Sequence, residues 1–481
     1  MGVAFKLICA LEEADGEDMM EYYGDVLAVG TIGDIVSLQG ENRVIVKKGL
    51  EQLKNTGNIG LRTLSETCGI PIEKEESIPV SFGIVPRINA AGRIADPKAA
   101  VRLLLTDDDE EARMLSGLID QNNRNRKELE EGIVRDIAKR LASDRLPLME
   151  RVVVLEAESW HQGVVGIVAA KLVNRYSKPC ILISIDGEEA CGSGRSVEGF
   201  SLIDAVSACS ECLTHYGGHK MAAGFSLKTK DIGRFKELLS TYTLTHYPDM
   251  PFHSLLIDKE LRAEELTVPN IAALKRLEPF GQGNPKPLFC VREAVLTGIC
   301  ELSGGKHLKL QLSKGGAPFY ALLFGQTKRE FPYRVKDRLD LAADCDINHY
   351  NGADSVSLKV KDLRLSGLRE EALFGGRNLY DRFLRQEKLP GGAAASIVPT
   401  REDVAVVYRY LRGCGVFAFD TDILFSRIPQ AEMGYCKMMM ILEILEELGL
   451  IRTSDREIQV VSSPQKTNIE QSAFLQKLRQ L

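Results

Sequence analysis

The stretch from residue 107 to residue 143 constrains the fold more than any other part of this sequence. Apolar residues recur in it at helical spacing, at Leu115, Leu118, Leu129, Ile133, Ile137 and Leu141. Its middle, DQNNRNRKE, is polar on every face of such a helix. Helices that are polar all round commonly bridge two domains through solvent. We therefore expect a connecting helix within residues 107–148 and a separate domain on each side of it.

The composition is that of an ordinary globular chain and excludes several classes of protein. Of the 481 residues, 44% are hydrophobic and 27% are charged, which fits neither a disordered chain nor a membrane protein. No run of about 18 apolar residues is present to span a bilayer, and the N-terminus lacks the pattern of a signal peptide. The 11 scattered cysteines indicate reduced thiols. These features predict a cytoplasmic location without a membrane partner, and the net charge of −6 neither favours nor excludes nucleic acid.

Residues 1–58 have the pattern of the tail of a larger α/β domain. An apolar opening predicts a helix, DVLAVGTI at residues 25–32 predicts a buried strand, and RVIVKKGLEQL predicts a second helix after a turn at Gly40. A single strand cannot form a sheet, because both of its edges would be unpaired. Asp34 follows this strand, and nothing nearby in the sequence offers its carboxylate a partner. We therefore expect the sheet to be completed from elsewhere.

The remaining sequence divides into three further domains. Residues 149–248 alternate strands and helices, which predicts a compact α/β domain. Residues 249–367 contain a Pro/Gly stretch, LEPFGQGNPKPLF, followed by about five short strands with a hairpin near Gly352, which suits an oligonucleotide-binding (OB) type β-barrel. Residues 368–481 are predicted to be a mainly helical module. The fold class expected is thus a multidomain α/β protein.

Two stretches place cations and hydroxyls beside glycine and alanine, where structure alone does not require them. One is PRINAAGRIAD, and the other is GSGRS, whose glycines at 192 and 194 would free backbone amides for an anion. The alternative is that both are ordinary glycine turns. The candidate anion-binding residues are Arg87, Asn89, Arg93, Ser193, Arg195 and Ser196.

Two histidines are further candidates. His219 lies in HYGGHKMAAG, which predicts a tight turn presenting an imidazole, and His161 lies in ESWHQG. His161 is equally consistent with an ordinary histidine at a helix N-terminus packed by Trp160. Cys209, Cys212, His215 and His219 are too close together in sequence for known zinc frameworks, and Cys209 fits an apolar helix stripe.

The barrel region carries a candidate face for single-stranded nucleic acid. Cations alternate with leucines in KHLKLQLSK, and aromatic rings follow nearby. Such a face would bind phosphates and stack bases. A solvated sheet face with core aromatics explains the pattern equally well. The candidate residues are Lys306, His307, Lys309, Tyr320 and Tyr350.

These stretches occur together and in order, and as a set they resemble the RecJ family of single-strand-specific 5′-to-3′ DNA exonucleases in the DHH phosphoesterase superfamily. The matching segments span about residues 2–365 and are GDVLAVGTIGDIVSLQGENRVIVKKGL, PRINAAGRIADPKAAVRLLL, ESWHQGVVGIVAAKL, GSGRS, HYGGHKMAAGFSL and LEPFGQGNPKPLF. The resemblance implies that residues 1–106 are the C-terminal remnant of a DHH domain and that residues 149–248 are the DHH-associated domain. It also implies a role in DNA repair and recombination.

The resemblance also implies roles for individual residues. Asp34 would be a ligand of a catalytic Mn²⁺ or Mg²⁺ pair, whose other ligands, a D-x-D motif and an Asp-His-His triplet, are expected upstream. No histidine precedes His161, so the triplet is not in residues 1–160. Ser193 and Arg195 would hold the substrate's 5′ phosphate with Arg93 and Arg87, and His161 and His219 would line the active-site cleft.

Two hypotheses therefore remain open. In the first, the chain is the C-terminal part of a RecJ-type exonuclease that is inactive alone, and the missing DHH half is either a separate chain or encoded directly upstream in the same gene. In the second, it is a metal-free relative that only binds single-stranded DNA or a partner protein.

Overall fold

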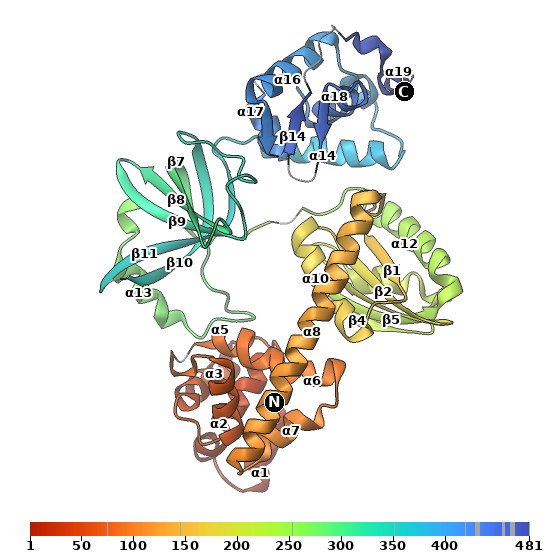
Figure 1. Ribbon diagram of the computed structural model, residues 1–481. Helices are drawn as coiled ribbons and strands as arrows, with labels where there is room; N and C mark the ends of the chain where they lie inside the picture. The colour runs from red at the N-terminus through yellow and green to blue at the C-terminus, as the bar shows by residue number, and fades with distance from the viewer. Residues whose placement is uncertain are drawn as a thin grey trace. The chain divides into compact units, whose positions relative to one another are not determined.

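The computed structural model of the chain describes residues 1–481 except 75, 145, 253, 351, 419, 429–432, 455–456, 462–466 and 481, and it leaves out the side chains of Lys74 and Tyr350. The chain divides into two compact units, residues 1–253 with 275–286, and residues 254–274 with 287–481. Helices and strands occur in both units (Figure 1), so the expected mixed α/β class is confirmed. Within the described ranges, no helix combines the length and the apolar character needed to cross a membrane.

The N-terminal part of the first unit is built from helices. They are α1 (Gly2–Leu11), α2 (Gly16–Gly33), α3 (Gly40–Leu53), α4 (Ile59–Cys68), α5 (Ser77–Pro79), α6 (Val85–Ile94) and α7 (Lys98–Leu105). The strand expected at residues 25–32 is wrong, because these residues form the second half of α2. Asp15 caps this helix by accepting hydrogen bonds from the amides of Glu17 and Asp18. The apolar run is continuous because α2 packs against both α1 and α3.

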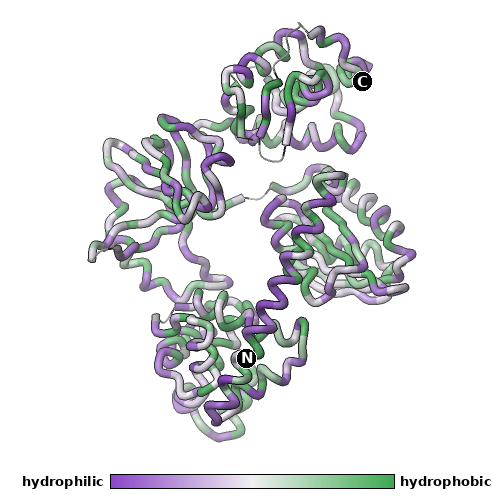
Figure 2. The backbone as a smooth tube through the Cα atoms, viewed as in Figure 1, coloured by the Kyte–Doolittle hydropathy of each residue, from purple (hydrophilic) through white to green (hydrophobic). Residues whose placement is uncertain are grey.

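The predicted connecting helix is α8 (Asp109–Ser143), and its hydrophilic middle is visible in Figure 2. The expectation that this middle is surrounded by solvent is wrong on one side. Asn123, Arg126 and Glu130 are buried, and the Arg126 guanidinium donates hydrogen bonds to the other two side chains. Lys171 also pairs with Glu130. Buried polar groups need such partners, so these residues are polar because they form a network inside the first unit.

The α/β domain that follows has one five-stranded sheet. Its elements are α9 (Leu146–Met149), β1 (Val153–Ala157), α10 (Gln162–Tyr176), β2 (Cys180–Asp186), β3 (Glu189–Arg195), α11 (Leu202–Ser207), β4 (His215–His219), β5 (Ala222–Lys228) and α12 (Ile232–His246). The strand order is β1-β2-β3-β5-β4, with β1 parallel to β2 and the other pairs antiparallel. The apolar residues of α10 pack with β1 and β2, and those of α11 and α12 pack with β5 from the opposite face.

The second unit contains the predicted barrel. Its elements are β6 (Lys259–Glu260), α13 (Val268–Ala273), β7 (Phe289–Leu302), β8 (His307–Lys314), β9 (Ala317–Phe324), β10 (Arg338–Tyr350) and β11 (Ala353–Leu365). The sheet runs β10-β11-β9-β8-β7-β6, and a further pairing of β10 with β7 closes it. Leu308, Leu310 and Leu312 of β8 point into the core, as their alternation predicts.

The C-terminal module is mainly helical, as expected, and also contains a small sheet that the sequence did not reveal. Its elements are α14 (Glu370–Leu384), α15 (Ala393–Ile397), α16 (Arg401–Cys414), β12 (Val416–Ala418), α17 (Thr421–Arg427), α18 (Tyr435–Glu447), β13 (Ile451–Thr453), β14 (Glu457–Val460) and α19 (Ala473–Leu478). The sheet is antiparallel in the order β12-β14-β13. This module and the barrel share one hydrophobic core.

Candidate functional site

Ser193 and Arg195 lie on β3 and point to the face of the sheet that α10 covers. The Arg195 guanidinium Nη1 donates hydrogen bonds to the Gly194 carbonyl oxygen at 2.8 Å and to the Ser193 hydroxyl at 3.3 Å. A glycine in α10 makes this possible, because a Cβ atom at Gly166 would lie 2.7 Å from Ser193 Oγ and 3.2 Å from Arg195 Nη2. These two candidate residues are therefore in direct contact with each other.

The expected role of the neighbouring glycines is wrong. Gly192 and Gly194 lie inside a strand that pairs with both β2 and β5, so they do not form a loop of free amides. They are needed for packing instead. A Cβ atom at Gly192 would lie 2.2 Å from the Phe225 ring, and one at Gly194 would lie 2.8 Å from the Leu202 side chain.

A second guanidinium, that of Arg93, reaches the same region from the end of α6. Its Nη1 donates a hydrogen bond to the Gly163 carbonyl oxygen at 3.3 Å. The two helices are in close contact, because a Cβ atom at Gly163 would lie 2.4 Å from the Arg93 carbonyl oxygen. Burial, together with the nearby charge of Arg93, lowers the pKa of Arg195. Among the described residues, neither arginine has a carboxylate partner. Two unneutralised cations held close together favour an anionic ligand.

The register of the sheet extends this site across β5 to β4. Arg195 is paired with Ala222, which is paired with His219, so these side chains share one row and one face. Ser193, Gly224 and Gly217 form the next row in the same way. Strands lie about 4.8 Å apart, so small residues separate the Arg195 and His219 positions by roughly 10 Å. β4 is exposed along its whole length. Small residues thus lie between a cationic side chain and an imidazole on one face of the sheet.

The two histidines are placed differently from one another. His219 ends β4 and is exposed, so the predicted turn is confined to the two residues after it. His161 is the N-cap of α10, and its Nδ1 accepts a hydrogen bond from the Gly163 amide at 3.1 Å. Trp160 is buried behind it and donates to Asp136 at 2.9 Å. This is the helix N-terminus packed by an indole that the sequence offered as an alternative. With Nδ1 accepting, the proton of the neutral ring is on Nε2.

Three other candidates lie outside this arrangement. Arg87 donates to the buried Asp120 at 2.9 Å and to the Gly83 carbonyl oxygen at 2.9 Å. Ser196 is buried, and its hydroxyl donates to the Phe200 carbonyl oxygen at 2.8 Å. Asn89 is exposed on α6. The first two side chains are thus engaged in structural hydrogen bonds, whereas Asn89, Arg93, Ser193 and Arg195 stay candidates for anion binding.

Asp34 is the C-cap of α2, not the end of a strand. Its side chain is 60% exposed, so the carboxylate is available to a ligand. The amino group of Met1 lies 3.6 Å from Oδ2. The end of α2 packs against the start of α6, because a Cβ atom at Gly33 would lie 3.4 Å from the Val85 side chain. Asp34 and Arg93 are therefore carried by two helices in direct contact.

On the barrel, the predicted basic and aromatic residues share an exposed face of β8 and β9. The Lys309 ammonium lies 4.1 Å from the centre of the Tyr320 ring, and the His307 and Phe324 rings are 5.2 Å apart. Tyr320 and Phe324 are 47% and 52% exposed. Lys306 is exposed in the turn before β8. The side chain of Tyr350 lies outside the described residues. The aromatic rings are therefore on the surface and not in the core.

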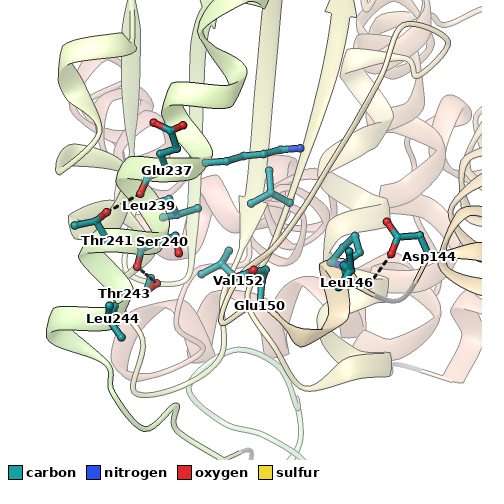
Figure 3. A pocket seen from close by; sticks show the side chains of 13 residues that line it. Asp144, Leu146, Glu150, Val152, Glu237, Leu239, Ser240, Thr241, Thr243 and Leu244 are labelled. Carbon is teal, nitrogen blue, oxygen red and sulfur yellow. Dashed lines mark hydrogen bonds between the residues drawn. The ribbon is translucent and has the colours of Figure 1, made fainter. Parts of the chain in front are cut away.

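A pocket of about 580 Å³ lies elsewhere in the first unit, between α9, β1 and α12 (Figure 3). Val152 and Leu239 line it together with Glu150 and Glu237. It adjoins β1, at the opposite edge of the sheet from β4. It is therefore separate from the row of residues that contains Arg195 and His219.

Known proteins share both the sequence and the fold of these parts. Residues 150–243 match the DHHA1 domain, and residues 257–362 match the RecJ OB domain. The single-stranded-DNA-specific exonuclease RecJ of Bacillus subtilis (strain 168) is 34% identical over 409 residues, which are 84% of this chain and 50% of that protein. RecJ of Thermus thermophilus is 36% identical over 380 residues, which are 78% of this chain and 52% of that protein. The chain belongs to the RecJ family.

The structural comparison agrees with this assignment. The crystal structure of T. thermophilus RecJ in complex with Mg²⁺ matches this chain with a TM-score of 0.64 at 31% identity, covering 74% of this chain and 54% of that one. The resemblance to RecJ found in the sequence is thereby confirmed. The chain spans about half the length of these RecJ relatives.

RecJ of T. thermophilus has been solved with Mg²⁺ and with Mn²⁺, so we asked whether this chain's residues fit such ions. In the described part of the chain, no group of three or more His, Cys, Asp or Glu side chains is able to hold a metal ion. Asp34 offers the hard oxygen ligand that these ions prefer, but a pair of ions needs several ligands. The side chains present do not fit a complete two-metal centre, and we assign no chemical step to one.

Sequence analysis missed the glycines that allow Arg93, Ser193 and Arg195 to lie close to α10. The pattern around Gly163 and Gly166 predicts only a helix, yet these glycines admit Arg93, Ser193 and Arg195. Their spacing of three, at the start of a predicted helix, puts both on one face and was the available signal. The small residues of β5 showed no such signal, because their importance depends on strand register.

Proposed function

We propose that this chain is the substrate-holding part of a RecJ-type exonuclease specific for single-stranded DNA, acting from the 5′ end. The observation that carries the proposal is the pair of arginines, Arg93 and Arg195, which lie close together without a carboxylate partner among the described residues. A terminal phosphate has the charge and the oxygen acceptors that such a pair binds.

Several residues of this chain would bind the 5′ end of the strand together. The Arg195 and Arg93 guanidiniums would donate to the phosphate oxygens, and the Ser193 hydroxyl, already bonded to Arg195, would add a third donor. His161, with its proton on Nε2, would be a further donor at the start of α10. A site that requires a terminal phosphate selects the strand end at which hydrolysis begins, which is the physical basis for 5′-to-3′ polarity.

The barrel face would hold the incoming strand. The exposed Tyr320 and Phe324 rings provide surfaces on which bases stack, and Lys306 and Lys309 neutralise phosphates. Stacking does not distinguish bases strongly, so this contact would be sequence-tolerant. It would also weaken with salt, because phosphate contacts release counterions.

Asp34 would contribute one ligand to a divalent metal site. A Mn²⁺ or Mg²⁺ pair supplies an activated water for phosphodiester hydrolysis when it is bound. We propose that the other ligands come from a second polypeptide segment, corresponding to the part of the RecJ relatives that this chain does not span. By itself the chain would then hydrolyse no DNA.

A second candidate function is binding without catalysis. The observation in its favour is the lack of a cluster of metal ligands among the described residues. In that case the chain would hold single-stranded nucleic acid for another protein, and the Asp34 carboxylate would have no role.

The test uses the purified chain and 3′-labelled single-stranded oligonucleotides that end in a 5′ phosphate or a 5′ hydroxyl. We expect tighter binding to the phosphorylated end, and no release of nucleotides in Mn²⁺. Adding a chain that carries the N-terminal half of RecJ from B. subtilis is expected to give 5′-to-3′ digestion that an Asp34→Asn variant does not support. Equal binding of both ends would contradict the phosphate site. Equal digestion by the Asp34→Asn variant would contradict the role of Asp34.

A further inference from the structure

The Pro/Gly stretch before the barrel folds as part of the first unit. Residues 275–286 belong to that unit, although the residues on both sides of them, 254–274 and 287–481, belong to the second. Within this stretch, the Asn284 side chain donates to the carbonyl oxygens of Leu277 at 2.9 Å and Pro279 at 2.8 Å. Residues 277–284 therefore form a closed loop, which we call the docked loop.

The docked loop contacts the residues that follow Asp34. The Leu38 amide donates to the Gln282 carbonyl oxygen at 2.7 Å, and the Gln39 side chain donates to the Gly283 carbonyl oxygen at 2.8 Å. The backbones pack closely, because a Cβ atom at Gly281 would lie 2.6 Å from the Leu38 side chain. Sequence segments more than 240 residues apart are thus joined immediately after a candidate metal ligand.

Arg43, near the start of α3, holds the docked loop in place. Its guanidinium donates to the carbonyl oxygens of Leu277 at 2.7 Å, Glu278 at 2.8 Å and Pro279 at 3.5 Å. These are backbone contacts that a shorter or smaller side chain cannot reproduce together. Ser77 adds one more bond, to the Phe280 carbonyl oxygen at 2.5 Å.

The backbone after Asp34 needs such support. Ile35 has a φ of 53°, a conformation that is unfavourable for a β-branched residue, and its side chain is exposed. The residue therefore gains little from packing to offset its conformation. The hydrogen bonds at Leu38 and Gln39 are what fix the chain direction on leaving α2.

We propose that the docked loop positions the Asp34 carboxylate and that Arg43 is the positioning residue through which it does so. This proposal rests on the proposed function, in which Asp34 is a metal ligand. The loop continues at both of its ends into the unit that contains the barrel. The segment that leads into the first long barrel strand thereby also sets the backbone beside the carboxylate.

The test is hydrogen–deuterium exchange of the full chain, followed by mass spectrometry of peptides covering residues 34–39 and 277–284. In Arg43→Ala, we expect amides in both segments to exchange at least tenfold faster than in the wild type, while the core of α2 is unchanged. Arg43→Lys keeps a single donor at the loop and is expected to restore only part of the protection.

A pair of glycine variants separates loop contact from backbone strain. Gly283 has a φ of 73°, and a Cβ atom there would lie 2.2 Å from Ser37 Oγ. Gly187 has a φ of 60° with nothing within 4 Å. Gly283→Ala is expected to deprotect residues 35–39, whereas Gly187→Ala is expected to leave them unchanged.

The proposal is overturned if Arg43→Ala exposes residues 277–284 but leaves residues 34–39 protected, or if it changes neither segment. This measurement needs neither DNA nor metal. If the chain does not bind a 5′ phosphate, the proposal about the docked loop is unaffected. If hydrogen exchange is unchanged in the variants, the proposed phosphate site is unaffected.

Discussion

Replacing Arg195 by alanine is expected to remove the preference for a 5′-phosphorylated end while leaving the fold intact. The Arg195 guanidinium bonds only to the Gly194 carbonyl oxygen and the Ser193 hydroxyl in the described structure. Burial and the charge of Arg93 lower its pKa, which means that the charged form is held at some cost. Removing it relieves this repulsion and forfeits about 1 kcal/mol of hydrogen bonding, so the unfolding temperature is expected to change little.

The effect on binding is larger. A hydrogen bond to a charged group contributes about 1.5–3 kcal/mol, and tenfold in affinity corresponds to about 1.4 kcal/mol. Loss of one arginine contact to the terminal phosphate is therefore expected to lower the ratio of affinities for 5′-phosphate and 5′-hydroxyl oligonucleotides by roughly 10- to 150-fold. The slope of log affinity against log salt is expected to fall by about 0.7, the value for one phosphate contact to a single strand.

The assay is fluorescence anisotropy with 3′-labelled oligonucleotides of identical sequence and different 5′ ends. Arg234→Ala is the matched control, because Arg234 is an exposed arginine of α12 in the same domain that pairs with Glu211 and Glu237. We expect the control to keep the preference for phosphate. The reasoning is refuted if Arg195→Ala keeps it too, or if the variant loses affinity for both ends equally.

Three more predictions test other parts of the structure. Gly166→Ala adds a methyl group at the anion site, so it is expected to lower the preference for a 5′ phosphate as Arg195→Ala does. Alanine in a helix favours folding by about 0.5–1 kcal/mol relative to glycine, so a loss of preference would not reflect a weaker helix. Anisotropy measures the preference and thermal unfolding measures the stability, and an unchanged preference contradicts the proposed contact. The double variant Lys309→Ala with Tyr320→Ala is expected to weaken single-strand binding by about 1–3 kcal/mol, equally for both 5′ ends, by the same anisotropy assay. Asp120→Ala leaves Arg87 with its charge unpaired and is expected to cost about 3–5 kcal/mol in urea unfolding. Burial raises the pKa of Asp120, but hydrogen bonds from two arginines outweigh burial and lower the pKa overall. The stabilisation from Asp120 is therefore full above about pH 4 and is lost as the pH falls through the folded-state pKa. If Asp120→Ala loses stability below pH 4 as steeply as the wild type does, this explanation is wrong.

Several local features were predictable because short-range patterns determine them. The alternation in β8 identified its buried leucines and placed half-buried Lys309 on the opposite face correctly, since strand residues alternate between faces. The family resemblance named Ser193 and Arg195 together, and in the structure they contact each other because residues two apart in a strand share a face. The prediction of a strand at residues 25–32 was wrong because contacts that are distant in the sequence determine this element. An apolar run of that length is compatible with a strand or with a helix buried on both sides, and only the packing of α1 and α3 against it decides which.

The sequence by itself determined which residues carry charge and which stretches are apolar enough to be buried. These patterns were sufficient to recognise the family, the barrel and the order of the domains. The tertiary structure decided which of those charges remain available. Arg87 and Arg93 lie on the same helix, yet Arg87 is bonded to Asp120 and Arg93 lies near Arg195. It also decided that residues 277–284 pack against Leu38 and Gln39, a few residues after Asp34. Such choices depend on contacts between residues far apart in the chain, and the free energy of those contacts exists only once the chain has folded.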